Sequence, residues 1–228
     1  MSWDERARLW GRHPTHLRRL ERARAAVRRA LAEHPTAYVA WSAGKDSGAV
    51  LQLAREVRPD IEARILTWPE TRLLGDYDRV IADWRARGAT IVEVGLTRSS
   101  VDERVAGRWS ALQGDSAAYL CGLRRDESRT RRIALSMFGD RDGVYRTAGG
   151  IVRAAPIQHW TTLDVAAFVQ AHAVPVLSVY TDTAEGFDRR TSTRVPRPSV
   201  RDAMLADLRE RNPAAYAALS ALYGLGSQ

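Results

Sequence analysis

The stretch from Thr36 to Ala54 reads Thr-Ala-Tyr-Val-Ala-Trp-Ser-Ala-Gly-Lys-Asp-Ser-Gly-Ala-Val-Leu-Gln-Leu-Ala. A short apolar run comes first, a turn of small residues with one lysine follows, and an apolar pattern of helical spacing completes it. This order predicts a strand, a loop and a helix. In an open α/β sheet, such a loop exposes unpaired backbone N–H groups and the positive end of the helix dipole. We therefore expect an anion to bind there.

The side chains of this loop suit a phosphate. Ser42, Ala43 and Gly44 are small enough to let a phosphate approach the backbone, and Ser47 can cap the helix or bind a phosphate oxygen. Among the 35 Lys and Arg residues, Lys45 is the only lysine. An ammonium is a compact point charge whereas a guanidinium is a wide planar fork, so a tight phosphate loop is where replacement by arginine is least tolerated. The alternative is an ordinary helix N-terminus with an incidental lysine.

Length and composition restrict the class of protein. The 228 residues suffice for one well-buried α/β domain, which we expect. The single cysteine, Cys121, excludes an intramolecular disulfide, a cysteine-rich zinc site and a four-cysteine iron–sulfur cluster within one chain. The formal charge of +8 suits a polyanionic partner, whether nucleotide, RNA or DNA. We find neither a signal peptide nor a membrane-spanning apolar run and expect a cytoplasmic protein with no membrane partner.

The remaining chain alternates between helical and extended patterns. Helices are predicted at residues 3–12, 14–33, 47–57, 75–87, 130–138, 199–211 and 213–222, with strands at 63–67 and 90–94, another around 119–121, and a hairpin from 143–147 and 151–155. Residues 96–114 are predicted to form a loop with a short helix around 101–109. The alternation predicts an α/β fold with a doubly wound, mostly parallel sheet and helices on both faces. We divide the chain into a helical extension (1–36), a nucleotide-binding core (37–180), and a basic loop with C-terminal helices (181–228).

The second predicted helix carries a basic surface made of Arg18, Arg19, Arg22, Arg24, Arg28 and Arg29. Such a surface can follow a nucleic-acid backbone. It can equally be a solvated face. The basic loop at 181–200 is long for a compact domain, so we expect it to cover the nucleotide or to hold a second substrate.

Two further groups of residues fall at predicted strand ends. Thr67 and Trp68 end the strand that follows the phosphate loop, where they could line an adenine pocket, although Trp68 could equally be a core residue. The segment from Gly122 to Arg131 brings charged residues to the end of the strand that contains Cys121. Arginines beside a phosphate loop can neutralise charge on a leaving pyrophosphate, whereas Arg124 and Glu127 could also simply pair at a helix start.

These motifs resemble those of a known family. A Walker A motif does not fit, because Val39 and Asp46 stand where it needs Gly and Ser or Thr. Residues 42–47 instead resemble the Ser-Gly-Gly-Lys-Asp-Ser signature of PP-loop ATP pyrophosphatases, with Ala43 in place of the first Gly. Residues 122–131 resemble the Gly-x-Arg-x-x-Glu-Ser-x-x-Arg segment of the phosphoadenosine phosphosulfate reductase branch. A third likeness, Pro…Trp…Asp-Val…Pro…Leu-x-x-Tyr, ends at Tyr180, and the similarity spans residues 37–187.

The resemblance implies an enzyme that binds ATP or a related adenine nucleotide and cleaves it between the α- and β-phosphates. It implies catalytic roles for Lys45 and Arg124 and Mg²⁺ held mainly by the phosphates, with Asp46 as a direct or water-mediated ligand. AMP would pass to an acceptor that the sequence does not name, such as tRNA, DNA or a small metabolite, and an oligomer is compatible with it. The expected nucleotide-binding residues are Ser42, Ala43, Gly44, Lys45, Asp46, Ser47, Thr67, Trp68, Gly122, Arg124, Glu127 and Arg131.

The resemblance has limits that leave two alternatives open. Sulfonucleotide reductases use a thiol in a C-terminal Glu-Cys-Gly motif, whereas residues 223–226 here are Tyr-Gly-Leu-Gly. Arg189 and Thr191 replace the paired cysteines of the cluster-binding branch, so no iron–sulfur cluster is expected. The first alternative is a reductase relative in sulfur metabolism that uses Cys121, otherwise a core residue, or a partner's thiol. The second is a catalytically silent regulator that binds nucleotide or nucleic acid.

Overall fold

The computed structural model describes residues 2–96, 112–140, 142–147, 149–182, 186–189 and 198–223, with side chains left out for 198–204 and 223. The short helix predicted around 101–109 and most of the basic loop lie outside these ranges.

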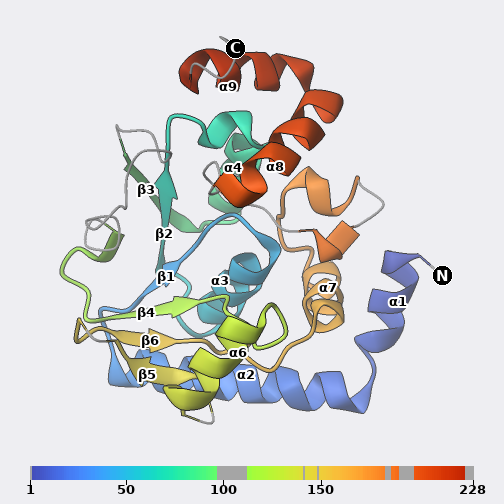
Figure 1. Cartoon of the computed structure of the whole chain (residues 1–228). Helices are drawn as coiled ribbons and strands as arrows, with labels where there is room; N and C mark the ends of the chain where they lie inside the picture. The colour runs from blue at the N-terminus through green and yellow to red at the C-terminus, as the bar shows by residue number, and fades with distance from the viewer. Residues whose placement is uncertain are drawn as a thin grey trace.

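A six-stranded sheet forms the centre of the protein (Figure 1), with strand order β3-β2-β1-β4-β6-β5. The strands are β1 Tyr38–Ala40, β2 Glu62–Thr67, β3 Thr90–Gly95, β4 Ala118–Cys121, β5 Val144–Arg146 and β6 Val152–Ala154. All neighbours pair in parallel except β5 and β6, which form an antiparallel hairpin. The predicted mostly parallel sheet is confirmed, and the hairpin ends it.

The helices follow the predicted pattern closely. They are α1 Trp3–Trp10, α2 Pro14–Glu33, α3 Lys45–Val57, α4 Tyr77–Ala86, α6 Arg129–Met137, α7 Thr162–Ala171, α8 Pro198–Arg211 and α9 Pro213–Tyr223. Short 3₁₀ turns η1 Thr71–Leu73, η2 Ser178–Tyr180 and η3 Gly186–Asp188 connect them. The helix predicted from Ser47 begins earlier, at Lys45, because Gly44 is its N-cap.

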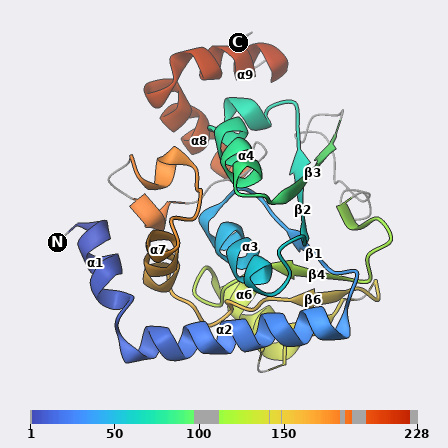
Figure 2. The ribbon, with the colours of Figure 1, turned by 180° about the vertical axis from the view of Figure 1, so that it is seen from behind.

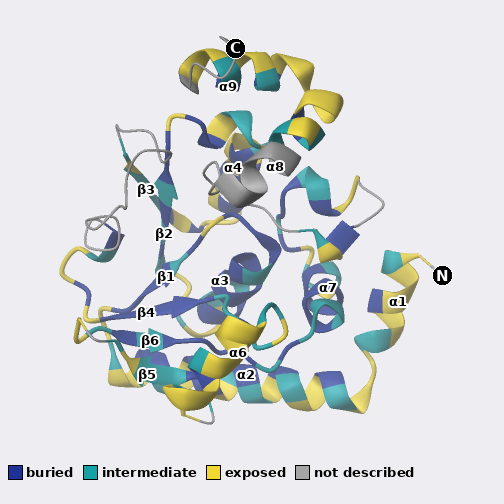
Figure 3. Cartoon of the chain, in the orientation of Figure 1, coloured by how far each residue is buried: buried dark blue, intermediate teal, exposed yellow. Residues whose placement is uncertain are grey.

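Helices cover the two faces of the sheet unequally. One face contributes Val39, Ile65 and Leu120 to a large buried core shared with α2, α3, α4 and α7, which lie in front of the sheet in Figure 2. The opposite face carries a smaller cluster that includes Leu135 of α6. Figure 3 shows α3 and the central strands mostly buried and the outer side of α6 mostly exposed. Strands β1, β2 and β4 contribute to both clusters, since successive side chains point to opposite faces.

Asp164 joins the N-terminal helices to the core. Its fully buried carboxylate accepts hydrogen bonds from Trp10 Nε1 at 2.7 Å and Arg19 Nη1 at 2.6 Å, and lies 3.0 Å from His16 Nδ1. It also forms a capping box with Thr161, which is the N-cap of α7. Trp160 and Asp164, which the resemblance singled out, therefore hold the architecture together. Within the described ranges, no helix combines the length and apolar character that a membrane span requires.

Candidate nucleotide-binding site

The loop between β1 and α3 is built to leave a helix N-terminus open. Gly44 is the N-cap of α3, and its position brings no side-chain cap to the first turn. Ser47 instead stabilises the loop from inside, because its Oγ donates to Gly44 O at 3.1 Å and accepts from Ser42 N at 3.1 Å. Ala43 has a φ of +55°, the left-handed conformation that glycine adopts most easily. The family signature has glycine at this position, and the left-handed backbone gives a physical reason for that glycine.

Gly122 allows β4 to approach this loop. A Cβ atom at Gly122 would lie 2.7 Å from both the carbonyl carbon of Asp46 and the backbone nitrogen of Ser47. Backbone atoms cannot yield as a flexible side chain can, so any larger residue would push β4 away from the first turn of α3. The predicted site residue Gly122 is thus required by close packing.

A cavity of about 290 Å³ opens at this point, at the carboxyl ends of β1 and β4. This is where ligands bind in open α/β sheets. Most of the predicted nucleotide-binding residues line it: Ser42, Gly44, Lys45, Asp46, Ser47, Gly122, Glu127 and Arg131. Ala40, Cys121, Leu123 and Tyr180 complete the lining.

Lys45 reaches into the enclosed side of this cavity, with a side chain only 6% exposed. Its Nζ donates to the carbonyl oxygen of Arg189 at 3.0 Å and lies 3.4 Å from Asp46 Oδ2. The same ammonium lies 4.9 Å from the centre of the Tyr180 ring, within the range of a cation–π interaction. The only ammonium side chain of the protein is therefore held at the wall of a concave site.

The two predicted arginines occupy different positions. Arg124 is buried behind the loop, where its Nε donates to Asp46 Oδ1 at 2.7 Å, and it does not line the cavity. Arg131 does line it, with a side chain 43% exposed and an ion pair to Glu127. Glu127 also accepts a hydrogen bond from the backbone N of Arg124 at 3.0 Å. Arg131 is thus the arginine that a bound anion can reach, and Arg124 supports the loop.

Thr67 and Trp68 are not among the lining residues. Both are buried, and the backbone N of Trp68 donates to Thr71 Oγ1 at 2.7 Å in the turn after β2. Their strand does neighbour β1 and ends at the same edge of the sheet. The structure brings them near the site but not into the cavity, and their contact with adenine stays a prediction.

Cys121 forms part of the cavity floor as a buried thiol. Burial raises the pKa of Cys121, against the lowering effect of the nearby Arg153. The thiolate is the nucleophilic form, so this thiol is poorly suited to attack.

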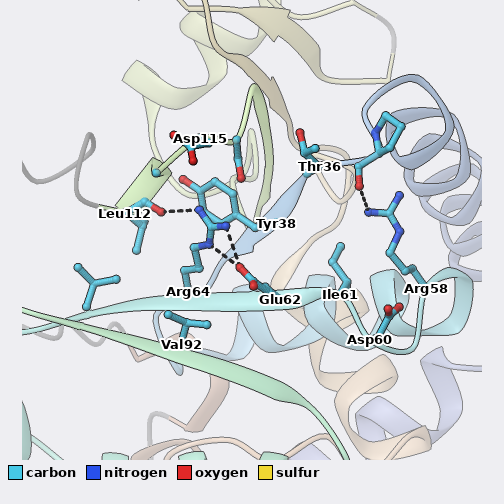
Figure 4. A pocket seen from close by; sticks show the side chains of 15 residues that line it. Thr36, Tyr38, Arg58, Asp60, Ile61, Glu62, Arg64, Val92, Leu112 and Asp115 are labelled. Atoms are coloured by element: carbon cyan, nitrogen blue, oxygen red, sulfur yellow. Dashed lines mark hydrogen bonds and ion pairs between the residues drawn. The ribbon is translucent and has the colours of Figure 1, made fainter.

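A larger cavity of about 660 Å³ lies at the opposite, amino-terminal ends of the strands (Figure 4). Its arginines are already bound within the protein. Arg64 donates Nε to Glu62 at 2.9 Å and Nη1 to Leu112 O at 3.2 Å, and Arg58 donates Nη1 to Pro35 O at 2.7 Å. The smaller cavity is therefore our candidate for the anion site.

The basic surface of α2 is largely neutralised within the chain. Arg19 pairs with Asp164, Arg24 with Glu56 and Arg29 with Asp140. Arg22 also lies 3.6 Å from Asp142. Charges that are paired internally contribute less to binding a phosphate backbone, so this surface gives little support to the nucleic-acid alternative.

Sequence reasoning did not select Tyr180 and Arg189 as site residues. Tyr180 had a signal, because it ends the third family likeness. Arg189 contributes only its backbone carbonyl to Lys45, and no side-chain pattern can reveal that contact.

The sequence of the chain is similar to those of known proteins. A family model for the phosphoadenosine phosphosulfate reductase domain matches residues 103–189. Sulfate adenylyltransferase subunit 2 of Nocardia farcinica is 28% identical over 209 residues, an alignment that covers 74% of this chain and 67% of that protein. These matches fit the PP-loop ATP pyrophosphatase superfamily, whose signature the loop at residues 42–47 resembles.

Solved structures extend the likeness to the fold of the chain. FMN adenylyltransferase of Candida glabrata in complex with ATP has a TM-score of 0.57 and 10% identity, over 78% of this chain and 65% of that chain. Phosphoadenylyl-sulfate reductase of Candida auris has a TM-score of 0.49 and 15% identity, over 70% of this chain and 83% of that chain. At such identities the likeness concerns the fold alone. The sequence matches, to a reductase domain and to a sulfate adenylyltransferase subunit, are matches to enzymes and support an enzyme at the level of the family.

Proposed function

We propose that this PP-loop protein binds ATP, cleaves it between the α- and β-phosphates, and transfers AMP to an oxygen acceptor with release of pyrophosphate. The observation that carries the proposal is the position of Lys45. The sole ammonium side chain lines a cavity beside a helix N-terminus that has no side-chain cap. Backbone N–H groups and a fixed positive charge in one recess are what a polyphosphate needs.

In this proposal the protein stabilises charge rather than forming a covalent bond. The acceptor oxygen attacks the α-phosphorus, a new P–O bond forms, and the bond from the α-phosphorus to the bridging oxygen breaks. Pyrophosphate leaves with the electron pair, and the acceptor's proton passes to water. Lys45 and Arg131 face the departing charge, and the first turn of α3 adds its dipole. Arg124 contributes by holding Asp46.

The residues present fit a Mg²⁺ ion that arrives with the nucleotide. Magnesium is commonly held by one or two carboxylates together with substrate phosphates. Asp46 and Glu127 are the carboxylates of the cavity lining. Among the described residues, no group of three or more His, Cys, Asp or Glu side chains is placed to hold a metal without the nucleotide. When bound, Mg²⁺ would neutralise phosphate charge, and Asp46 would hold it directly or through water.

Product analysis tests the proposed reaction. The protein is incubated with ATP labelled at the α-phosphate, Mg²⁺ and fractionated acceptors, namely tRNA, DNA and small metabolites. We expect label in AMP or in an adenylated acceptor, with an equal amount of pyrophosphate. Release of ADP and phosphate would contradict the proposal.

A reductase relative is the second candidate, favoured by one observation. Cys121 lines the nucleotide cavity and is the only thiol of the chain. Its raised pKa argues against it as a nucleophile. A sulfite-release assay with phosphoadenosine phosphosulfate and thioredoxin tests this candidate, which requires sulfite release. Unchanged release in Cys121→Ser would exclude Cys121 as the thiol and leave a partner's thiol.

A further inference from the structure

The ammonium of Lys45 is oriented by groups outside the phosphate loop as well as within it. An ammonium has three N–H donors. One donates to the carbonyl oxygen of Arg189, and the nearest carboxylate oxygen, Asp46 Oδ2, lies 3.4 Å away. One hydrogen bond and one neighbouring carboxylate together restrict where the ammonium can lie. The carbonyl of Arg189 therefore helps to decide where Lys45 points.

A salt bridge holds Arg189 in place from α8. The guanidinium of Arg189 is paired with Asp207, which also accepts from Arg211 Nε at 2.9 Å. Hydrogen bonds from Arg211 and Arg189 lower the pKa of Asp207 to about 2, against the raising effect of burial. Asp207 is therefore ionised at neutral pH and keeps its hold on Arg189.

The other side of η3 is fixed by α1. Gly186 has a φ of +51°, and a Cβ atom there would lie 2.7 Å from Trp3 Cδ1. The Phe187 ring lies 6.0 Å from the Trp3 ring and 6.0 Å from the Tyr180 ring. The segment that offers its carbonyl to Lys45 is thus held between a helix near each end of the chain.

We propose that Asp207 is a positioning residue for Lys45, acting through Arg189. The salt bridge keeps the Arg189 carbonyl hydrogen-bonded to the ammonium, which holds Lys45 at the wall of the cavity. The inference rests on the proposed function only in that Lys45 serves a nucleotide phosphate. Helices α1 and α8 thereby help to position Lys45, although neither lies next to the phosphate loop in the sequence.

The test uses the fact that Lys45 is the only lysine. Acetylation by an N-hydroxysuccinimide ester is followed by mass spectrometry of the peptide that contains Lys45, with the α-amine of the N-terminus read in a separate peptide. Asp207→Asn and Arg189→Gln break the salt bridge from either side, Asp207→Glu preserves the charge, and Arg211→Ala is the matched control that leaves the Asp207–Arg189 pair. Circular dichroism checks that each variant is folded.

We expect Asp207→Asn and Arg189→Gln to speed Lys45 acetylation about tenfold, as loss of a charged hydrogen bond would. In Asp207→Glu and Arg211→Ala, the rate of Lys45 acetylation should stay within about twofold of the parent rate, because the charged pair with Arg189 is kept. Where pyrophosphate release is observed, kcat should fall in the two salt-bridge variants more than KM rises. An unchanged acetylation rate in folded Asp207→Asn and Arg189→Gln, or an equal rise in Arg211→Ala, would overturn the inference. If the parent chain releases no pyrophosphate, the proposed function fails. The acetylation rates still test whether Asp207 positions Lys45.

Discussion

Arg124 donates its Nε to Asp46 Oδ1 at 2.7 Å, from a side chain that is only 4% exposed. The pair joins the segment that follows β4 to the first turn of α3, next to Lys45, which lines the cavity. Sequence motifs alone suggested that Arg124 touches the nucleotide. Its position indicates that it acts by fixing the phosphate loop.

Asp46→Asn should therefore destabilise the fold as well as the site. Removing the carboxylate leaves the buried Arg124 guanidinium without its nearest negative charge, which should lower the free energy of unfolding by about 3 kcal/mol. Urea denaturation measures the change. The matched control is Asp126→Asn, since Asp126 lies 3.6 Å from Arg124 Nη1 but is 52% exposed. Its effect should stay below about 1 kcal/mol, and equal losses in both variants would refute the role assigned to Asp46.

Gly122→Ala tests the close approach of β4 to α3. The new methyl group would meet the backbone at Asp46 and Ser47, so we expect a loss of about 2 kcal/mol in stability and weaker ATP binding. Gly149→Ala is the control, because the nearest atom to a Cβ there is Thr147 Oγ1 at 4.0 Å. Thermal denaturation and equilibrium dialysis with ATP measure the two effects. Normal ATP affinity in Gly122→Ala would show that the contact does not shape the site.

The lowered pKa of Asp164 makes the free energy of unfolding depend on pH. Burial alone would raise the pKa of Asp164, but hydrogen bonds from His16, Thr161 and Trp10 outweigh it and lower the pKa. Because the folded-state pKa lies below the unfolded value, the contribution is complete above about pH 4 and is lost as the pH falls further.

Asp164→Asn should accordingly lower the free energy of unfolding by about 3 kcal/mol at pH 7. The variant should also lose less stability than the parent chain as the pH falls. Asp83→Asn provides the control. Asp83 is 46% exposed and pairs with Arg79 at 2.8 Å, so its change should cost less than about 1 kcal/mol. Urea titrations between pH 3 and 7 measure both variants, and parallel pH curves for Asp164→Asn and the parent would contradict this assignment.

Cys121→Ala should leave nucleotide turnover near the parent rate. The thiol packs in the cavity floor, and its raised pKa keeps it protonated at neutral pH. We expect pyrophosphate release within about threefold of the parent, the change typical of modest repacking near a site. A loss of a hundredfold or more in a folded Cys121→Ala protein would assign the thiol a chemical role.

The elements near Lys45 were predictable because each depends on local sequence. The apolar run ending at Ala40, the small residues that follow and the helical pattern after Lys45 define strand, loop and helix without tertiary information. The alternation of strands and helices then restricts the topology, and the hairpin could be read from its glycines. The first residues of the helices were less certain, because they depend on the N-caps, which are Gly44 in α3 and Thr161 in α7.

The less predictable features arise from contacts between distant segments. Arg124 and Asp46 are far apart in sequence, so a motif could mark both residues without revealing that they pair with each other. Trp68 was equally consistent with a pocket wall and with a buried turn, and burial favours the turn. The hold of Arg189 on Lys45 uses a backbone atom, which no residue type encodes.

The most direct test of the central claim compares ATP and AMP binding to the parent chain and to Lys45→Met, which keeps an unbranched side chain and removes the charge. Isothermal titration calorimetry in the presence of Mg²⁺ gives both dissociation constants. If Lys45 faces the terminal phosphates, ATP affinity should fall about a hundredfold, the size expected for losing one well-placed charged donor, while AMP affinity stays unchanged. An unchanged ATP affinity, or an equal loss for ATP and AMP, would contradict the account.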